Sequence, residues 1–331
     1  MATQAFSKDV LHIDAESECR KIEQTLRDQV GNRFRKKGAV IGLSGGIDSS
    51  VTVALCARAF GSNRVLVLFM PEHDSSDDSL DFGRLVAEKF GVPTVLEEIG
   101  PFLDAAGCYK RRDDAIRKQL PEYGPEYKSK LVLASILDTK GFNYFHLVVQ
   151  SPKGEQKKIR LDAQTYLEIV AATNMKQRAR KFFEYYHADR LNYAVAGTPN
   201  RLEYDQGFFV KNGDGAADFK PIAHLYKSQV YQLAAYLEIP PEVLKRPPTT
   251  DTYSLAQSQE EFYFALPYDQ MDLCLYAKDH GISPSEVAPV IERTEEQVLL
   301  IYDDIERKRS VARYLHSSPL LVEDISTGGN K

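Results

Sequence analysis

Residues 40–50 read V-I-G-L-S-G-G-I-D-S-S, an apolar run followed by small and polar residues. Val40–Leu43 is a short apolar run that is typical of a buried strand. Two glycines follow it at Gly45 and Gly46, and glycine lets a backbone turn tightly and approach a ligand. The residues after Asp48 are apolar and alanine-rich, which suits a buried helix. The stretch therefore predicts a strand, a glycine turn and a helix.

The turn has the chemistry of a phosphate site. A helix start leaves backbone N–H groups unpaired, and its dipole favours an anion. Ser44, Ser49 and Ser50 add hydroxyl donors. Asp48 would repel a bare phosphate, so the turn predicts a phosphate that carries Mg²⁺. The patterns G-x-x-x-x-G-K-[ST] and G-x-G-x-x-G do not occur in this turn, and an ordinary capped connection between strand and helix is the alternative.

Composition excludes several classes of protein. The chain has 331 residues, of which 43% are hydrophobic and 27% are charged, so it can bury one large core or two smaller ones. Its net charge of -5 disfavours a general nucleic-acid binder. The four cysteines form no C-x-x-C pair, which argues against structural zinc. No signal peptide or membrane-spanning stretch is evident, so we expect a cytoplasmic protein without a membrane or nucleic-acid partner.

Further strands and helices alternate along the first half of the chain. Residues 65–70, 93–96 and 193–196 predict buried strands, and residues 79–90 predict a helix. Continuous apolar strands between helices indicate a doubly wound α/β fold, with a mostly parallel sheet and helices on both faces. Ligands bind such sheets beyond the carboxyl ends of the strands. We expect one domain over residues 1–331, with a helical C-terminal part.

The region 101–172 is less regular and predicts an insertion. Within it, residues 142–162 indicate a β-hairpin, and the charged residues 110–114 favour a solvated helix face. The hairpin could be a lid, a partner-binding arm or an inert insertion. Residues 174–187 predict a basic amphipathic helix, for which a solvated face and an anion site are equally good interpretations.

Several motifs together resemble those of a known enzyme family. S-G-G-I-D-S-S alone resembles the pyrophosphate loop of N-type ATP pyrophosphatases, which have an adenine nucleotide alpha hydrolase-like fold. The whole set resembles the NAD synthetase family. Its motifs here are S-G-G-I-D-S-S at 44–50, N-M-K-Q-R-A-R at 174–180, G-T-P-N-R-L-E-Y at 197–204, G-F-F-V-K-N-G-D-G-A-A-D at 207–218, L-Y-K at 225–227, P-P-T at 247–249 and R-K-R at 307–309.

The resemblance implies an activity. The family amidates nicotinic acid adenine dinucleotide (deamido-NAD) to NAD with ammonia. ATP and Mg²⁺ are required, the carboxylate passes through an acyl-adenylate, and AMP and pyrophosphate are released. The resemblance also implies a homodimer. Only about forty residues precede the first strand, too few for a glutaminase domain. We therefore expect free ammonia, or ammonia from a separate glutaminase.

The resemblance also assigns roles to residues. Asp48 and Lys227 correspond to catalytic positions, and Asp48 and Glu203 to magnesium ligands. The positions that contact ATP are Ser44, Gly45, Gly46, Ile47, Asp48, Ser49, Ser50, Thr198, Lys227 and Thr249. The positions that hold deamido-NAD are Arg178, Lys211, Asp218, Arg307 and Lys308, with Phe208 and Asp214 in the same loop.

Three residues depart from the pattern of the family. Pro199 replaces a small residue, Arg201 replaces a common lysine, and Arg307 replaces a usual histidine. Arginine keeps a donor but stays charged at every pH. A related enzyme that amidates a different carboxylate is therefore an open alternative. A tRNA-modifying enzyme is disfavoured by the acidic composition, and a non-catalytic nucleotide sensor by the intact Asp48, Glu203 and Lys227.

Overall fold

The computed structural model describes residues 5–133, 145–247, 252–255, 257–258, 260–264, 266–323 and 325. The chain begins with a 3₁₀ turn, η1 (Lys8–Leu11), and helix α1 (Ala15–Leu26), which continues as a π-helical segment, η2 (Arg27–Arg33). Asp14 caps α1, because its carboxylate accepts hydrogen bonds from the backbone of the first turn. These elements lead into the central sheet.

A parallel sheet forms the centre of the molecule, as the sequence predicts. Its strands are β1 (Ala39–Gly42), β2 (Val65–Phe69), β3 (Thr94–Leu96) and β7 (Ala194–Val195), in the order β3-β2-β1-β7. In the register of the ladders, Ala39 of β1 lies opposite Val65 and Ala194. β1 is thus a central strand, and its carboxyl end opens directly into the serine-glycine turn.

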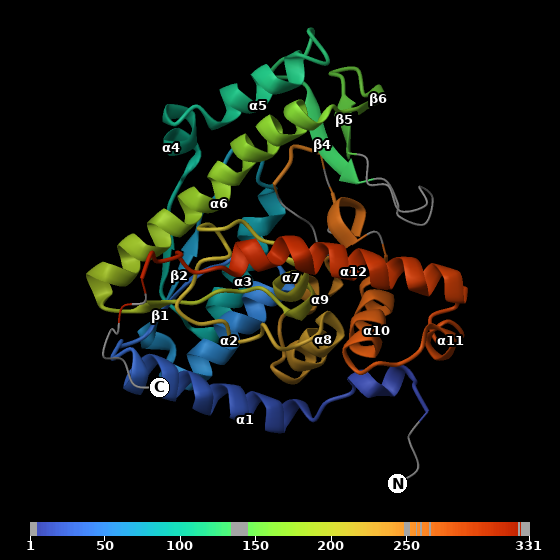
Figure 1. Cartoon of the computed structure of the whole chain (residues 1–331). Coiled ribbons are helices and arrows are strands. Elements are labelled where there is room, and N and C mark those ends of the chain that lie inside the picture. Colours follow the sequence, from blue (N-terminus) through green and yellow to red (C-terminus); the bar gives the residue numbers. More distant parts are fainter. Residues whose placement is uncertain are drawn as a thin grey trace.

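Helices cover both faces of this sheet (Figure 1). On one face Ile41 packs with α1, α2 (Ile47–Phe60), α3 (Asp77–Phe90) and α8 (Lys227–Tyr236). On the other face Val40 packs with α4 (Gly100–Ala105), α5 (Cys108–Arg117) and α6 (Ala163–Leu191). Burial on both faces explains why the strands read as continuous apolar runs rather than as alternating ones. The predicted doubly wound architecture is confirmed.

The region 101–172 is more regular than the sequence indicates. It contains most of α4, all of α5 and an antiparallel sheet of β4 (Lys128–Leu133), β5 (Phe145–Gln150) and β6 (Gln156–Arg160). β5 and β6 form the predicted hairpin, whose residues 142–144 lie outside the described part of the chain. β4 was not predicted from the sequence, and within it only Ser129, Leu131 and Leu133 are buried.

Two predictions about solvated charges are wrong in part. Arg112, in the charged run on α5, is buried and forms ion pairs with Asp74 at 2.5 Å and Asp113 at 2.9 Å. Lys176, on the basic helix, has 0% of its surface exposed. That helix is the middle of α6, which runs from the second sheet past the parallel sheet (Figure 1). Both side chains face protein because carboxylates lie opposite them.

Shorter elements and helices complete the fold. They are η3 (Ser62–Arg64), α7 (Arg201–Gln206), α9 (Pro241–Lys245), η4 (Glu260–Phe264), α10 (Tyr268–Asp279), α11 (Pro284–Val287) and α12 (Glu295–His316). The R-K-R motif lies in the middle of α12, where Arg309 pairs with Asp205 and Asp279. No helix in the described ranges is long and apolar enough to cross a membrane.

Candidate active site

The turn after β1 is shaped by Gly45, whose φ is +72°. A Cβ atom at this position would lie 2.5 Å from the carbonyl oxygen of Ser79, so only glycine fits against α3. The Gly46 N–H donates to Ser44 Oγ at 3.3 Å, and the Ser44 and Ser49 hydroxyl oxygens are 3.2 Å apart. The turn therefore holds its hydroxyl groups together at the start of α2.

A cavity of about 260 Å³ lies over this turn. Its lining includes Ser44, Gly46, Ile47, Asp48 and Ser49, joined by Thr198 and Lys227 from later segments. The structure thus brings together most of the residues assigned to ATP. Two members of the turn lie outside the lining of this cavity. Gly45 packs against α3, and the Ser50 hydroxyl donates to the Gly46 carbonyl at 2.8 Å. Thr249 lies outside the described residues.

Three cationic side chains line the same cavity: Arg180, Lys227 and Arg246. The guanidinium of Arg246 reaches Ser79 Oγ at 2.8 Å and Ser76 Oγ at 3.1 Å. A cluster of cations and hydroxyls suits a polyphosphate. Arg180 and Arg246 are not among the predicted site residues, although Arg246 directly precedes the P-P-T motif and Arg180 ends the N-M-K-Q-R-A-R motif.

Lys227, Asp48, Asn200 and Glu203 form one connected group. The ammonium of Lys227, 1% exposed, forms an ion pair with Asp48 Oδ2. Asp48 Oδ1 accepts a hydrogen bond from Asn200 Nδ2 at 3.1 Å. The Asn200 N–H donates to Glu203 Oε2 at 3.0 Å, in the capping box that begins α7. The cap that starts this helix therefore also aims a carboxylate at the phosphate cavity.

This group contains two carboxyl groups, of Asp48 and Glu203, but only one cation, Lys227. Burial, together with the charge of Asp48, raises the pKa of Glu203 to about 8. Burial opposes the charge of Lys227, but Asp48 and Glu203 raise its pKa above the ordinary value. Two carboxylates on one wall with a shared neighbour form a hard-oxygen donor pair that suits Mg²⁺. Within the described ranges, no cluster of three or more histidine, cysteine, aspartate or glutamate side chains could hold a metal. Phosphate oxygens and water would have to supply the remaining ligands.

A second cavity of about 600 Å³ adjoins the first. Gln177, Thr198, Glu203 and Asp214 line both, so the two cavities meet at these side chains. The second cavity is lined mainly by aromatic and aliphatic residues and also by Arg307 and Lys308. Its aromatic side chains are Phe145, Tyr166, Phe208, Phe209, Tyr253, Phe262 and Tyr263. An apolar cavity with a few polar groups suits an organic ligand.

Asp214 lies at the junction of the two cavities. Its Oδ1 accepts a hydrogen bond from the Val210 N–H at 2.8 Å, which holds the side chain within the glycine-rich loop. Burial raises the pKa of this carboxyl, although Lys181 and Arg180 lower it. Phe208, Asp214, Arg307 and Lys308 are thus four of the seven predicted dinucleotide residues, and all four line the second cavity.

The other three predicted dinucleotide residues lie elsewhere. Arg178, Lys211 and Asp218 are absent from the described linings of both cavities. Arg178 Nε donates to the Lys211 carbonyl at 3.3 Å, and Lys211 Nζ donates to the Tyr314 carbonyl at 2.7 Å. Asp218 accepts from the Tyr185 hydroxyl at 3.2 Å. Arg178 and Lys211 thus lie beside each other near the end of α12, and Asp218 lies beside Tyr185 of α6.

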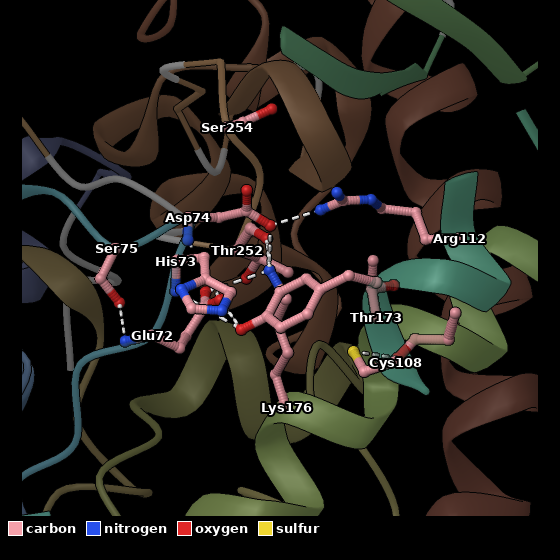
Figure 2. A network of polar contacts seen from close by, with 12 residues as sticks. Glu72, His73, Asp74, Ser75, Cys108, Arg112, Thr173, Lys176, Thr252 and Ser254 are labelled. Carbon is pink, nitrogen blue, oxygen red and sulfur yellow. Dashed lines mark hydrogen bonds and ion pairs between the residues drawn. The ribbon is translucent and has the colours of Figure 1, made fainter. Parts of the chain in front are cut away.

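A buried polar network supports the walls of both cavities (Figure 2). The ammonium of Lys176 contacts Glu72 at 3.0 Å, Asp74 at 2.5 Å and the Thr252 carbonyl at 2.8 Å. Arg112 pairs with the same Asp74 oxygen, and the Tyr109 hydroxyl donates to Glu72 at 2.8 Å. The loop after β2 lines the first cavity through Ser75, and Thr252 lines the second. The network thus joins one wall of each cavity.

A model of the NAD synthase family matches residues 18–119 and 138–312 of this chain. The chain is 61% identical over 320 residues to a protein of Rhizobium meliloti (strain 1021) named NH(3)-dependent NAD(+) synthetase, covering 97% of this chain and 96% of that protein. It is 32% identical to a protein of the same name from Thermotoga neapolitana, covering 80% of this chain and 85% of that protein.

Solved structures share the fold at lower identity. The structure of NMN synthetase from Francisella tularensis has a TM-score of 0.63 and 20% identity, and the match covers 94% of this chain and 99% of that chain. NH3-dependent NAD synthetase from Campylobacter jejuni has a TM-score of 0.59 and 21% identity, and the match covers 94% and 100%. These similarities place the architecture among known structures.

Proposed function

The chain belongs to the NAD synthase family, and from this membership we propose how its own residues carry out the amidation of deamido-NAD to NAD with ammonia and ATP. The observation that carries the proposal is the junction of the two cavities. One cavity has the hydroxyls and cations that a polyphosphate needs, and the other has the aromatic wall that a pyridine nucleotide needs. An acyl-adenylate must form where the two substrates meet.

The first cavity holds ATP, with its phosphates over the turn at 44–50. In the first step a carboxylate oxygen of deamido-NAD attacks the α-phosphorus, and pyrophosphate leaves. Negative charge on the attacking, transferred and leaving groups must be neutralised. Lys227, Arg180 and Arg246 line the cavity and supply that charge without protonation steps. Lys227 is the most enclosed of the three, so its electrostatic contribution is the least screened.

Mg²⁺ bound with ATP would be held by Asp48 and Glu203. Burial and the charge of Asp48 raise the pKa of Glu203, and a divalent cation beside the two carboxylates would favour their ionised forms. The ion supplies charge neutralisation at the phosphates when bound. Asn200 holds both carboxylates in place, because its side-chain amide donates a hydrogen bond to Asp48 and its backbone N–H donates one to Glu203. Asp48 is therefore shared between the metal and Lys227.

The second step takes place at the side chains that line both cavities. Ammonia attacks the acyl carbon of the adenylate, AMP leaves with one former carboxylate oxygen, and a proton is released. This step needs no protein nucleophile. The four cysteines, Cys19, Cys56, Cys108 and Cys274, are all buried and free. Burial raises the pKa of the thiols, which makes them poor nucleophiles.

We also propose that the protein is a homodimer and works in the cytoplasm. Arg178, Lys211 and Asp218 lie outside the aromatic cavity, so the part of deamido-NAD they hold would lie at the surface. Phe182 and Tyr186 of α6 are 60% and 57% exposed, an unusual exposure for aromatic residues. A second copy packed on α6 would cover them. Light scattering of the purified protein tests the dimer, and a monomer at all concentrations would contradict it.

The activity is tested with purified protein, ATP, Mg²⁺, ammonium chloride and deamido-NAD. We expect NAD and AMP in equal amounts, and neither product when ammonium is omitted and no other amine is present. The variant Lys227→Met should bind deamido-NAD with normal affinity but lose most of its turnover, because the ammonium acts on phosphate charge. A variant with normal turnover would show that Lys227 has no role in adenylation.

A further inference from the structure

Asp272 of α10 is a fully buried carboxylate that caps a different helix. The residue is 0% exposed. Its Oδ2 accepts a hydrogen bond from the Ser228 N–H at 2.7 Å, and its Oδ1 accepts one from the Lys227 N–H at 3.2 Å. Lys227 and Ser228 are the first two residues of α8, and N–H groups at a helix start have no partner within the helix. Asp272 therefore fixes the backbone at the point from which the Lys227 side chain extends.

The cap of α8 comes from a distant part of the chain. The residue before the helix is Tyr226, and tyrosine does not have the short polar side chain that usually caps a helix. The carboxylate of Asp272 lies 45 positions beyond Lys227 in the sequence. Burial raises the pKa of Asp272 to about 6, although the hydrogen bonds from Ser228 and Lys227 lower it. The carboxylate is therefore mostly ionised at neutral pH, and it ties the positive end of α8 to the neighbouring α10 (Figure 1).

Helix α10 also contacts the charged end of the Lys227 side chain. Tyr268 lies four residues before Asp272, so the two side chains lie on one face of α10. The centre of the Tyr268 ring is 5.5 Å from Lys227 Nζ, within the range of a cation–π interaction. The same ammonium pairs with Asp48 at the phosphate cavity. One face of α10 thus holds Lys227 both at its backbone and at its ammonium.

We propose that α10 is a positioning element for Lys227, in which Asp272 fixes the start of α8 and Tyr268 supports the ammonium that faces the phosphate cavity. The inference rests on the proposed function and deepens it. Asp272 and Tyr268 are absent from the described linings of both cavities, so they act through Lys227 and not on a substrate. Displacement of a catalytic group by about 1 Å can cost about a hundredfold in rate. Loss of either contact should therefore lower turnover.

The first test is the variant Asp272→Asn. Its amide has one acceptor oxygen instead of two, so one N–H group at the start of α8 loses its partner. We expect kcat to fall by about 10- to 100-fold at a temperature well below the melting temperature. The KM for deamido-NAD should stay unchanged, because Lys227 is absent from the described lining of the second cavity. A folded variant with normal kcat, or with a raised KM for deamido-NAD instead, would overturn the inference.

The matched control for this variant is Leu273→Ala. Leu273 is the next residue of α10 and is 2% exposed, in a hydrophobic cluster. Its truncation leaves a cavity and destabilises the fold, but it removes no printed contact with Lys227. The control should therefore have a lower melting temperature and a normal kcat at the assay temperature. An equal loss of kcat in the control would show that any damage to α10 lowers turnover, and the specific role of Asp272 would be wrong.

The second test asks whether Asp272 acts through Lys227. In the variant Lys227→Met no ammonium remains to be positioned, so adding Asp272→Asn should leave the residual turnover unchanged. AMP formation at high enzyme concentration measures this residual turnover. Two independent losses would multiply instead. A double variant that is about tenfold slower than Lys227→Met would overturn the inference.

The variant Tyr268→Leu decides the matter if Asp272→Asn fails to fold. It removes the ring beside the ammonium, so kcat should fall about threefold or more, but not in the Lys227→Met background. A normal kcat in Tyr268→Leu would overturn the role of α10. If the natural enzyme amidates deamido-NAD and these variants have normal kcat, only the inference is wrong and the function stands. If the natural enzyme forms no NAD from deamido-NAD, the function is wrong and the inference fails with it.

Discussion

Lys176 offers the sharpest prediction about the architecture of the site. Its ammonium is fully buried and lies between Glu72, Asp74 and the Thr252 carbonyl, in the network of Figure 2. The substitution Lys176→Met keeps the length of the side chain and removes its charge. Arg112 would still pair with Asp74, but Glu72 would lose its ion-pair partner. Glu72 would keep the hydrogen bond from the Tyr109 hydroxyl but would remain a buried carboxylate without a cationic partner.

The cost follows from this loss. Removing one partner of a buried ion pair costs about 3–5 kcal/mol. For a chain of 331 residues, an unfolding entropy of about 2.1 cal/mol/K per residue gives about 0.7 kcal/mol per degree. We therefore expect the melting temperature of Lys176→Met to fall by about 4–7 °C.

The assay is thermal unfolding of the natural protein and of two variants at the same pH. The matched control is Lys118→Met, which breaks an exposed pair with Glu168 that also joins α5 to α6. Its melting temperature should stay unchanged, since exposed pairs contribute little. Because the network joins one wall of each cavity, Lys176→Met should also raise the KM of both ATP and deamido-NAD. A melting temperature like that of the control would refute the reasoning.

Three further predictions concern the ATP cavity. Asp48→Asn should abolish turnover, because it removes a carboxylate shared by the proposed Mg²⁺ and Lys227; unchanged activity would exclude the metal assignment. Arg246→Met should raise the KM for ATP with little effect on the KM for deamido-NAD, since Arg246 lines only the first cavity. For Glu203 the folded-state pKa of about 8 exceeds the ordinary 4.5, so its contribution to stability is complete below pH 4.5 and is lost as the pH rises to about 8. Glu203→Gln should remove this loss from the metal-free protein, as measured by melting temperature against pH; an unchanged pH profile would contradict it.

Much of the fold could be predicted from the sequence. β1 and β2 are continuous apolar runs, and the turn between β1 and α2 contains glycines that only a tight connection needs. These local signals are strong because the strands are buried on both faces. β4 was missed, since Lys128-Ser129-Lys130 reads as polar until its partner strand is known. Long-range pairing decides such a strand.

Part of the candidate site could be predicted from the sequence, because several of its residues lie in family motifs. Asp48, Glu203 and Lys227 lie in family motifs, and the fold brings them together at the carboxyl end of the sheet. Arg180 lies in one of these motifs and Arg246 directly precedes another, but only the tertiary structure shows that both side chains line the ATP cavity. Arg112 and Lys176 read as solvated charges because their partner carboxylates, Glu72 and Asp74, are far away in the sequence.

The central claim is that ATP adenylates the carboxylate of deamido-NAD before ammonia attacks it. Deamido-NAD labelled with ¹⁸O in its carboxylate tests this directly. The proposed reaction transfers one labelled oxygen to AMP and leaves the other in the amide of NAD. Mass spectrometry should find one ¹⁸O in each AMP molecule and none in pyrophosphate. Unlabelled AMP formed together with labelled NAD would contradict the claim.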